Sequence, residues 1–226
     1  MRFPGTVIFD LDGTLVDSAP DLTGALNHTM RTLNLPEVAD DDVRHMVGHG
    51  ALALIQKALT AAGTTLPDDE FDAALLVFLR YYGQHVADRT TAFPNVIETL
   101  GLLRDHGVKL GVCTNKPQRL TDQLLESLGL THWFGAIVGA DSVPEKKPHA
   151  GHLVATVERL GGDLNSTVMV GDSQTDVDTA RNAGTPVVAV SFGYSTVPAA
   201  DLLADQLIDD FNELPAALEG LMGARG

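Results

Sequence analysis

Residues 6 to 16 read TVIFDLDGTLV, an apolar run that passes directly into two aspartates and a glycine. Four apolar or β-favouring residues before a turn signal are typical of a buried strand, here Thr6 to Phe9. Asp10 and Asp12 are two residues apart, so in an extended backbone their side chains point the same way. The stretch therefore predicts a buried strand that ends in a pair of carboxylates.

The remainder of the chain alternates strand and helix patterns. Apolar runs predict further strands at 108–113, 136–138, 168–170, 187–190 and 206–208. Helical periodicity is found between them, at 96–103, 120–128 and 214–221. This alternation predicts an α/β fold with a doubly wound, Rossmann-like parallel sheet that is covered on both faces.

One long segment interrupts this alternation. Residues 17–88 carry no strand signal and contain only amphipathic helical patterns, the first of which starts at Ser18-Ala19-Pro20-Asp21, a capping residue with an early proline. We expect a helical-bundle cap over 17–88, inserted into an α/β core made of 1–16 and 89–226.

Composition narrows the possible partners. The 226 residues carry a formal charge of −15, which argues against a nucleic-acid partner because polyphosphate binding needs a basic face. The sequence has no apolar run of transmembrane length and no leader pattern, so we expect no membrane association. The single cysteine, Cys113, fits a reducing cytoplasm. Any anionic ligand would need local positive charge to offset the acidic field.

Polar residues gather where the predicted strands end. Asp10 and Asp12 follow the first strand, Thr114-Asn115 follows the second, Lys146-Lys147-Pro148 lies after the third, and Gly171-Asp172 ends the fourth. In an open parallel sheet, ligands bind beyond the carboxyl ends of the strands. Four polar clusters at four such ends therefore predict a single site.

Each cluster also has an ordinary structural explanation. Asp12-Gly13 taken alone favours a simple turn, and Gly171-Asp172-Ser173 could be a capped helix start. We expect one residue of the pair Lys146-Lys147 to be a solvated loop lysine. It is the combination, in this order along one chain, that favours a functional site.

The combination resembles a known superfamily. The run DLDGTLV at 10–16, together with Thr114, Lys147 and the run GDSQTD at 171–176, is similar to the four motifs of haloacid dehalogenase superfamily phosphatases. The likeness extends over essentially the whole chain, and the helical segment after the first motif resembles the smaller cap type of that superfamily. The resemblance implies phosphoryl transfer to an aspartate.

The resemblance implies a role for each core residue. Asp10 would be the nucleophile that forms an aspartyl phosphate, and Asp12 the general acid and base. Gly13 would allow a close approach of phosphate. Thr114 and the Asn115 amide would donate hydrogen bonds to phosphoryl oxygens, while Lys147 offsets the charge repulsion between phosphate and Asp10.

The same resemblance implies a Mg²⁺ cofactor. Its ligands would be the Asp10 carboxylate, the Asp12 backbone carbonyl and the Asp172 carboxylate, with Asp176 in support. The substrate would be a small phosphorylated metabolite.

Asp12 also separates the alternatives within the superfamily. Dehalogenases lack this second aspartate, because a halide leaves without a proton. Phosphonoacetaldehyde hydrolases replace it too and need a cap lysine, whereas the only one here, Lys57, has a surface pattern. A phosphomutase of the β-phosphoglucomutase type keeps both aspartates, so this alternative is not excluded by the core residues. A non-catalytic binding protein on the same fold has no need for both aspartates, so their presence argues against this alternative.

Details that extend beyond the four motifs resemble the phosphoglycolate phosphatase group. These are DGTLVDSAPDL at 12–22, VGHGA at 47–51 and SFGY at 191–194. We expect the cap residues His45, Gly48, His49 and Gly50 to contact the substrate, and a two-carbon phosphate would suit a closed cap with little spare volume. A broad small-molecule phosphatase and a pyrophosphatase remain alternatives, and the oligomeric state is not predicted.

Overall fold

A six-stranded parallel sheet forms the centre of the molecule. The computed structural model describes residues 3–48 and 50–223. The strand order is β5-β4-β1-β6-β7-β8, with parallel pairing throughout. The bounds are β1 Thr6–Phe9, β4 Lys109–Cys113, β5 Ala136–Val138, β6 Thr167–Gly171, β7 Val187–Val190 and β8 Gln206–Ile208. The chain runs outward from β1 to β4 and β5, then returns to β6 on the other side of β1, so β1, β4 and β6 meet at the switch point.

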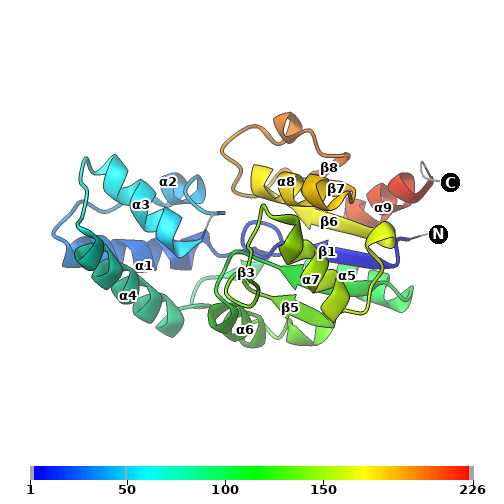
Figure 1. The fold of residues 1–226 in the computed structure, drawn as a ribbon, viewed down its shortest axis with the longest axis horizontal. Helices are drawn as coiled ribbons and strands as arrows, with labels where there is room; N and C mark the ends of the chain where they lie inside the picture. Colours follow the sequence, from blue (N-terminus) through cyan, green and yellow to red (C-terminus); the bar gives the residue numbers. More distant parts are fainter. Residues whose placement is uncertain (1–2, 49, 224–226) are drawn as a thin grey trace.

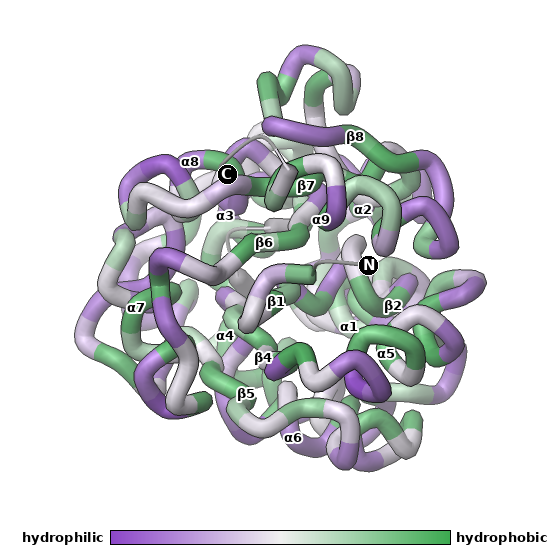
Figure 2. The backbone as a smooth tube through the Cα atoms, turned by 90° about the vertical axis from the view of Figure 1, so that its right-hand side faces the viewer, coloured by the Kyte–Doolittle hydropathy of each residue, from purple (hydrophilic) through white to green (hydrophobic). Residues whose placement is uncertain are grey.

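Helices cover both faces of this sheet, as the sequence predicts. Side chains of β1 alternate between the faces: Val7 and Phe9 join the larger apolar cluster, whereas Ile8 joins the smaller one. α7 and α8 cover the face of the smaller cluster, while α5, α6 and α9 cover the other. Figure 2 shows the strands as a mainly hydrophobic centre. The helices are α5 Val96–Asp105, α6 Gln118–Ser127, α7 Ala150–Arg159, α8 Gln174–Ala183 and α9 Leu214–Gly223, with 3₁₀ turns η1 Thr131–Trp133, η2 Leu164–Ser166, η3 Ala199–Leu202 and η4 Phe211–Glu213.

Four helices stand apart from the sheet, on the side away from the termini (Figure 1). They are α1 Ala19–Thr32, α2 Asp40–Arg44, α3 Ala51–Ala61 and α4 Asp68–Gln84. α1 packs along α4, and α2 and α3 lie against this pair. All four lie between residues 17 and 88. No helix in the described part of the chain is long and apolar enough to cross a membrane.

Two short links join these helices to the sheet. β2 Val16–Asp17 pairs antiparallel with β3 Thr91–Ala92, which the sequence did not predict because two residues carry no periodicity. β2 thus straddles the expected 16/17 boundary. The buried carboxylate of Asp21 on α1 accepts hydrogen bonds from the backbone N–H groups of Arg89 and Thr90 at 2.8–3.1 Å. The entry and exit strands of the helical segment are therefore fastened together.

Candidate active site

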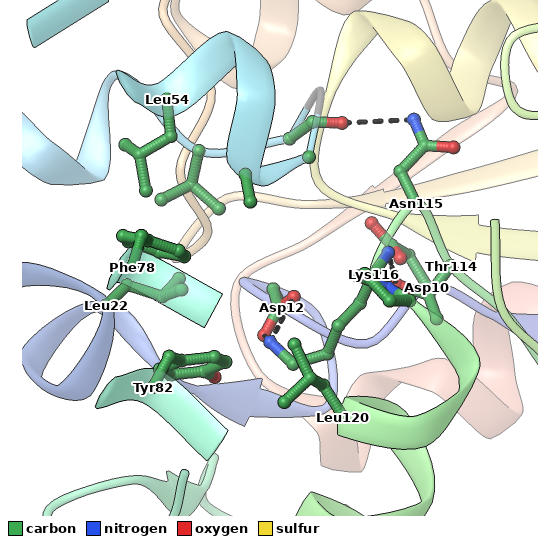
Figure 3. Close-up of a pocket in the computed structure, with 15 residues that line it drawn as sticks. Asp10, Asp12, Leu22, Leu54, Phe78, Tyr82, Thr114, Asn115, Lys116 and Leu120 are labelled. Carbon is green, nitrogen blue, oxygen red and sulfur yellow. Dashed lines mark hydrogen bonds and ion pairs between the residues drawn. The ribbon is translucent and has the colours of Figure 1, made fainter. Parts of the chain in front are cut away.

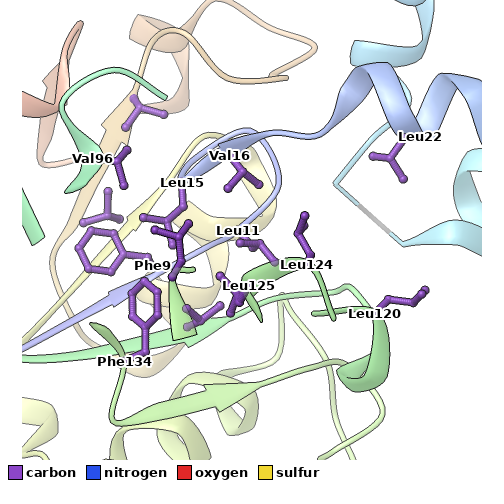
Figure 4. Packing of buried hydrophobic residues seen from close by; sticks show 14 of the residues in the cluster. Phe9, Leu11, Leu15, Val16, Leu22, Val96, Leu120, Leu124, Leu125 and Phe134 are labelled. Carbon is purple, nitrogen blue, oxygen red and sulfur yellow. The ribbon is translucent and has the colours of Figure 1, made fainter. Parts of the chain in front are cut away.

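The turn after β1 places Asp10 and Asp12 at the carboxyl edge of the sheet (Figure 3). The backbone N–H of Leu11 donates to Asp10 Oδ1 at 2.7 Å. Leu11 and Leu15 are fully buried and pack with Phe9 beneath the turn (Figure 4). Gly13 has φ +84°, and a Cβ there would lie 2.5 Å from Asp172 Oδ2. Only glycine fits this point, where the turn touches the loop that follows β6.

Three carboxylates from distant parts of the chain meet beside this turn. Asp10, Asp172 and Asp176 each offer an oxygen, and these oxygens lie within 4.8 Å of one another. Asp172 follows β6 and accepts hydrogen bonds from the Thr14 hydroxyl at 3.0 Å and the Tyr194 backbone N–H at 2.7 Å. This arrangement holds Asp172 in a fixed orientation toward Asp10.

Asp176 lies at the start of α8, and its two carboxylate oxygens have different partners. Its Oδ2 accepts hydrogen bonds from the backbone N–H and the hydroxyl of Ser173, at 3.1 and 2.7 Å. Its Oδ1 accepts from Lys147 Nζ at 2.7 Å. Asp176 therefore caps the start of α8 and also pairs with Lys147.

Lys147 supplies the positive charge of this cluster. Its ammonium lies 2.9 Å from Asp10 Oδ1 and its side chain is buried, whereas Lys146 is exposed as expected. The backbone N–H of Lys147 donates to His152 Nδ1 at 3.2 Å. Burial lowers the pKa of His152 to about 4, so this ring is neutral and can accept. His152 was not predicted, because its place in α7 gives no signal of a contact with the preceding loop.

The cluster contains three carboxyl groups and one close ammonium, that of Lys147. Burial raises the pKa of Asp10 to about 7, although Lys147 acts in the opposite direction. Burial, and then the charges of Asp176 and Asp10, raise the pKa of Asp172 well above its ordinary value. Three carboxylates share one close ammonium, and hard carboxylate oxygens are the ligands that Mg²⁺ and similar cations prefer. The residues present therefore fit a divalent metal, which would supply the missing positive charge.

Asp12 has a cationic partner of its own. Lys116 Nζ donates to both Asp12 oxygens, at 2.8 and 2.9 Å, and the Ser18 hydroxyl donates to Oδ1 at 2.5 Å. Ser18 begins α1 without making the side-chain cap bond that its type suggests, because its hydroxyl is used here. Sequence reasoning missed Lys116. Its place directly after Thr114-Asn115, at the end of β4, was the available signal.

Thr114 and Asn115 lie buried after β4, and the Asn115 side chain points toward the segment before α3 (Figure 3). The Asn115 side-chain Nδ2 donates to the backbone carbonyl oxygens of Gly48 and Lys147, at 3.3 and 3.2 Å. These bonds join the segment before α3 to the sheet. They occupy both hydrogen-bond donors of the side-chain amide.

A cavity of about 40 Å³ opens between the sheet edge and the four helices. Its polar lining is drawn from Asp10, Asp12, Thr114, Asn115, Lys116 and Tyr82, and the rest of its wall is formed by Leu22, Val47, Gly48, Gly50, Ala51, Leu54, Phe78, Pro117 and Leu120. Gly48 and Gly50 line this cavity. His45 does not: it lines a separate groove with Met46 and Lys57. His49 lies outside the described residues.

Comparison with known proteins gives a consistent identification. The family model of haloacid dehalogenase-like hydrolases matches residues 7–190. A relative from Agrobacterium fabrum, named phosphoglycolate phosphatase, is 43% identical over 219 residues, which cover 97% of this chain and 94% of the relative. A second of that name, from Caulobacter vibrioides, is 46% identical over 212 residues and covers 94% and 90%.

A solved structure agrees with this. It is described as a predicted phosphoglycolate phosphatase from Haemophilus somnus, and it superposes with a TM-score of 0.88 at 34% identity over 96% of this chain and 98% of its own. The matched model spans both the turn after β1 and the loop after β6, the two segments that bring Asp10 and Asp172 together. The chain therefore belongs to the haloacid dehalogenase-like hydrolase family.

Proposed function

We propose that this protein is a Mg²⁺-dependent phosphomonoester hydrolase whose preferred substrate is 2-phosphoglycolate. The observation that carries the proposal is the meeting of Asp10, Asp172 and Asp176 with Lys147, next to Asp12, at the carboxyl ends of β1 and β6. Such a cluster suits phosphoryl transfer, which depends on an in-line nucleophile and on neutralisation of charge at the phosphoryl oxygens. Full-length likeness to phosphoglycolate phosphatases supports the substrate.

The reaction would proceed in two displacements on phosphorus. In the first, a carboxylate oxygen of Asp10 forms a bond to phosphorus while the bond to the leaving oxygen breaks, and Asp12 gives that oxygen its proton. In the second, Asp12 takes a proton from water as the water oxygen bonds to phosphorus. The aspartyl-phosphate bond then breaks, which restores the Asp10 carboxylate and releases phosphate.

The surrounding residues would orient and neutralise the phosphoryl group. Lys147, held by Asp176, would face an equatorial oxygen, with the Thr114 hydroxyl and the Asn115 backbone N–H as further donors. Asp10, the Asp12 carbonyl and Asp172 would hold Mg²⁺, and Gly13 would leave room for the phosphate. When bound, this ion neutralises charge on the phosphoryl oxygens.

The small cavity supports a small substrate. A volume of about 40 Å³ corresponds to roughly three water positions, at about 10–15 Å³ each. A two-carbon phosphoester is closer to this size than a sugar phosphate with a second phosphate group, which a phosphomutase must accommodate. In this proposal residues 17–88 act as a cap that limits the cavity, with 1–16 and 89–226 as the catalytic core. A cytoplasmic location stays a prediction.

Phosphate release with Mg²⁺ tests the proposal directly. The panel would contain 2-phosphoglycolate, pyrophosphate, glucose 6-phosphate and a nucleoside monophosphate, each with and without EDTA. We expect EDTA-sensitive release and a kcat/KM for 2-phosphoglycolate at least about 100-fold above the others. A flat profile would contradict the proposed substrate and leave a general phosphatase. No release from any substrate would contradict the hydrolase itself.

A further inference from the structure

Two buried polar atoms in the cavity wall have no hydrogen-bond partner. They are the Tyr82 hydroxyl and Asn115 Oδ1, and they are the only buried side-chain nitrogen or oxygen atoms of this kind within residues 3–48 and 50–223. Tyr82 is 1% exposed and Asn115 is 8% exposed. Leaving such a group unpaired costs about 1–3 kcal/mol. That both occur in one cavity indicates that the cavity is built for a polar ligand.

A buried ammonium lies over the ring of Tyr82. Lys116 is 5% exposed, and its Nζ lies 4.6 Å from the centroid of the Tyr82 ring. Its two hydrogen bonds to Asp12 leave one of the three N–H donors of an ammonium. Figure 3 shows Lys116 reaching from the end of β4 toward Asp12, between the sheet edge and the wall that bears Tyr82.

The two cations of the site serve different ends of a bound substrate. Lys147 contacts Asp10, where phosphorus is attacked, whereas Lys116 contacts Asp12, which faces the leaving oxygen in the proposed reaction. In that reaction, the part of the substrate beyond the leaving oxygen would meet Lys116. Around it the wall is apolar, formed by side chains such as Leu22, Leu54 and Phe78.

An ammonium and a phenol hydroxyl in an apolar wall select a particular chemistry. Both can donate, and a carboxylate only accepts, so it can be bound by both at once. A sugar or alcohol would bury several hydroxyl groups against Leu and Phe side chains without partners. A short hydrocarbon stem ending in a carboxylate suits this wall.

We propose that Lys116, with the Tyr82 hydroxyl, binds the carboxylate of the substrate. This contact would make the enzyme prefer phosphorylated short hydroxy acids to phosphate esters of equal length whose other end is uncharged. Lys116 is then the residue that determines specificity, while Asp10, Asp12 and Lys147 serve any phosphomonoester. This inference rests on the proposed hydrolase function and assigns its selectivity to one side chain that the family motifs do not name.

A matched substrate pair tests the inference. 2-Hydroxyethyl phosphate has the length of 2-phosphoglycolate but carries CH₂OH in place of the carboxylate. We expect the wild type to prefer 2-phosphoglycolate by at least about 100-fold in kcat/KM, since the site has donors placed for the missing group. Lys116→Met should reduce this preference to below about 10-fold, and Lys116→Arg should retain part of it because the charge is kept.

Two further variants provide the controls. Tyr82→Phe removes only the hydroxyl and should reduce the preference about 5-fold, the value of one hydrogen bond. Lys146→Met changes an exposed lysine outside the cavity and should match the wild type. The inhibition constant of inorganic phosphate, measured on every variant, should stay within about 3-fold, because Lys147 and Thr114 are untouched. An intact phosphate constant also shows that Lys116→Met is folded.

The outcomes separate the inference from the proposed function. An unchanged preference in both Lys116→Met and Tyr82→Phe would overturn the role of Lys116 and leave the hydrolase standing. A wild type that hydrolyses both substrates equally well would overturn it too. A wild type that releases phosphate from neither substrate would instead contradict the proposed function.

Discussion

The two walls of the active-site cavity differ in nearly every physical respect. On the sheet side, Asp10, Asp172 and Asp176 are buried with Lys147, in a network of ion pairs and hydrogen bonds. On the helical side the wall is apolar, and its Tyr82 hydroxyl is unpartnered. Charged groups in a low dielectric interact strongly with one another, so a change on the sheet side disturbs all of them.

This contrast distinguishes the groups proposed to carry out the reaction from the groups proposed to select the substrate. The sheet-side groups are held by turns at strand ends, which the core beneath them fixes in place. The helical side contributes shape and the Tyr82 hydroxyl, so changes there, like changes at Lys116 on the facing sheet edge, should alter which substrate is accepted. We therefore expect large losses from changes on the sheet side and graded losses from changes on the helical side.

The largest effect is expected for Asp10→Asn. An amide cannot replace the carboxylate as nucleophile, so kcat for 2-phosphoglycolate should fall by at least about 10⁴-fold. Phosphate release under saturating substrate measures it, with Asp69→Asn, an exposed helix position, as the control expected to match the wild type. Activity within about 10-fold of the wild type would exclude Asp10 as the covalent group.

A stability loss should follow from Lys147→Met. The change leaves Asp10 and Asp176 without the ammonium that lies 2.9 and 2.7 Å away. Breaking a buried pair costs about 3–5 kcal/mol, and we expect this loss in the free energy of unfolding at about pH 8 in EDTA. Near pH 5 the loss should be smaller, because Asp10, with a pKa of about 7, can be protonated. An equal loss at both pH values would contradict this account of the cluster, and Lys146→Met is the matched control.

A smaller, pH-dependent effect is expected from Mg²⁺. Burial raises the folded-state pKa of Asp10 from 3.8 to about 7, so the metal-free protein loses stability as pH rises through that range. Mg²⁺ binds the ionised carboxylates and competes with protons. The Mg²⁺-induced rise in Tm should therefore be small near pH 5.5 and should grow toward about pH 8. A rise that is independent of pH, or one that Asp172→Asn leaves intact, would place the metal elsewhere.

The smallest effect on activity is expected from substitution of two glycines on the helical side. Gly48 and Gly50 have φ of +112° and +88°, so alanine is strained at both, by about 1–2 kcal/mol. They differ in surroundings: a Cβ at Gly50 would lie 3.2 Å from the Asn115 backbone oxygen, and one at Gly48 meets nothing within 4 Å. Gly50→Ala should lower kcat/KM for 2-phosphoglycolate about 10-fold, and at least about 3-fold more than Gly48→Ala. Equal effects would show that strain, and not contact with the sheet side, is responsible.

Much of the sheet side could be predicted because its signals are local. Strands at 6–9, 136–138, 187–190 and 206–208 were predicted to the residue, since each is a short, mainly apolar segment. The buried Lys147 and the exposed Lys146 also match the expectation that one of the pair is solvated. The helical side was predicted only as helices. Its periodicity identifies an apolar face and leaves open what that face covers.

The sequence by itself determined the α/β order, the helical insertion and the polar residues at the strand ends, because strand and turn preferences act over a few residues. Only the tertiary structure decided which side chains contact one another. Lys116 lies 104 positions from Asp12, and its contact exists because β4 pairs with β1 in this register. His45, which was expected to contact the substrate, lies in another groove with Met46 and Lys57. Long-range contacts follow from how whole elements pack, and no local pattern encodes that packing.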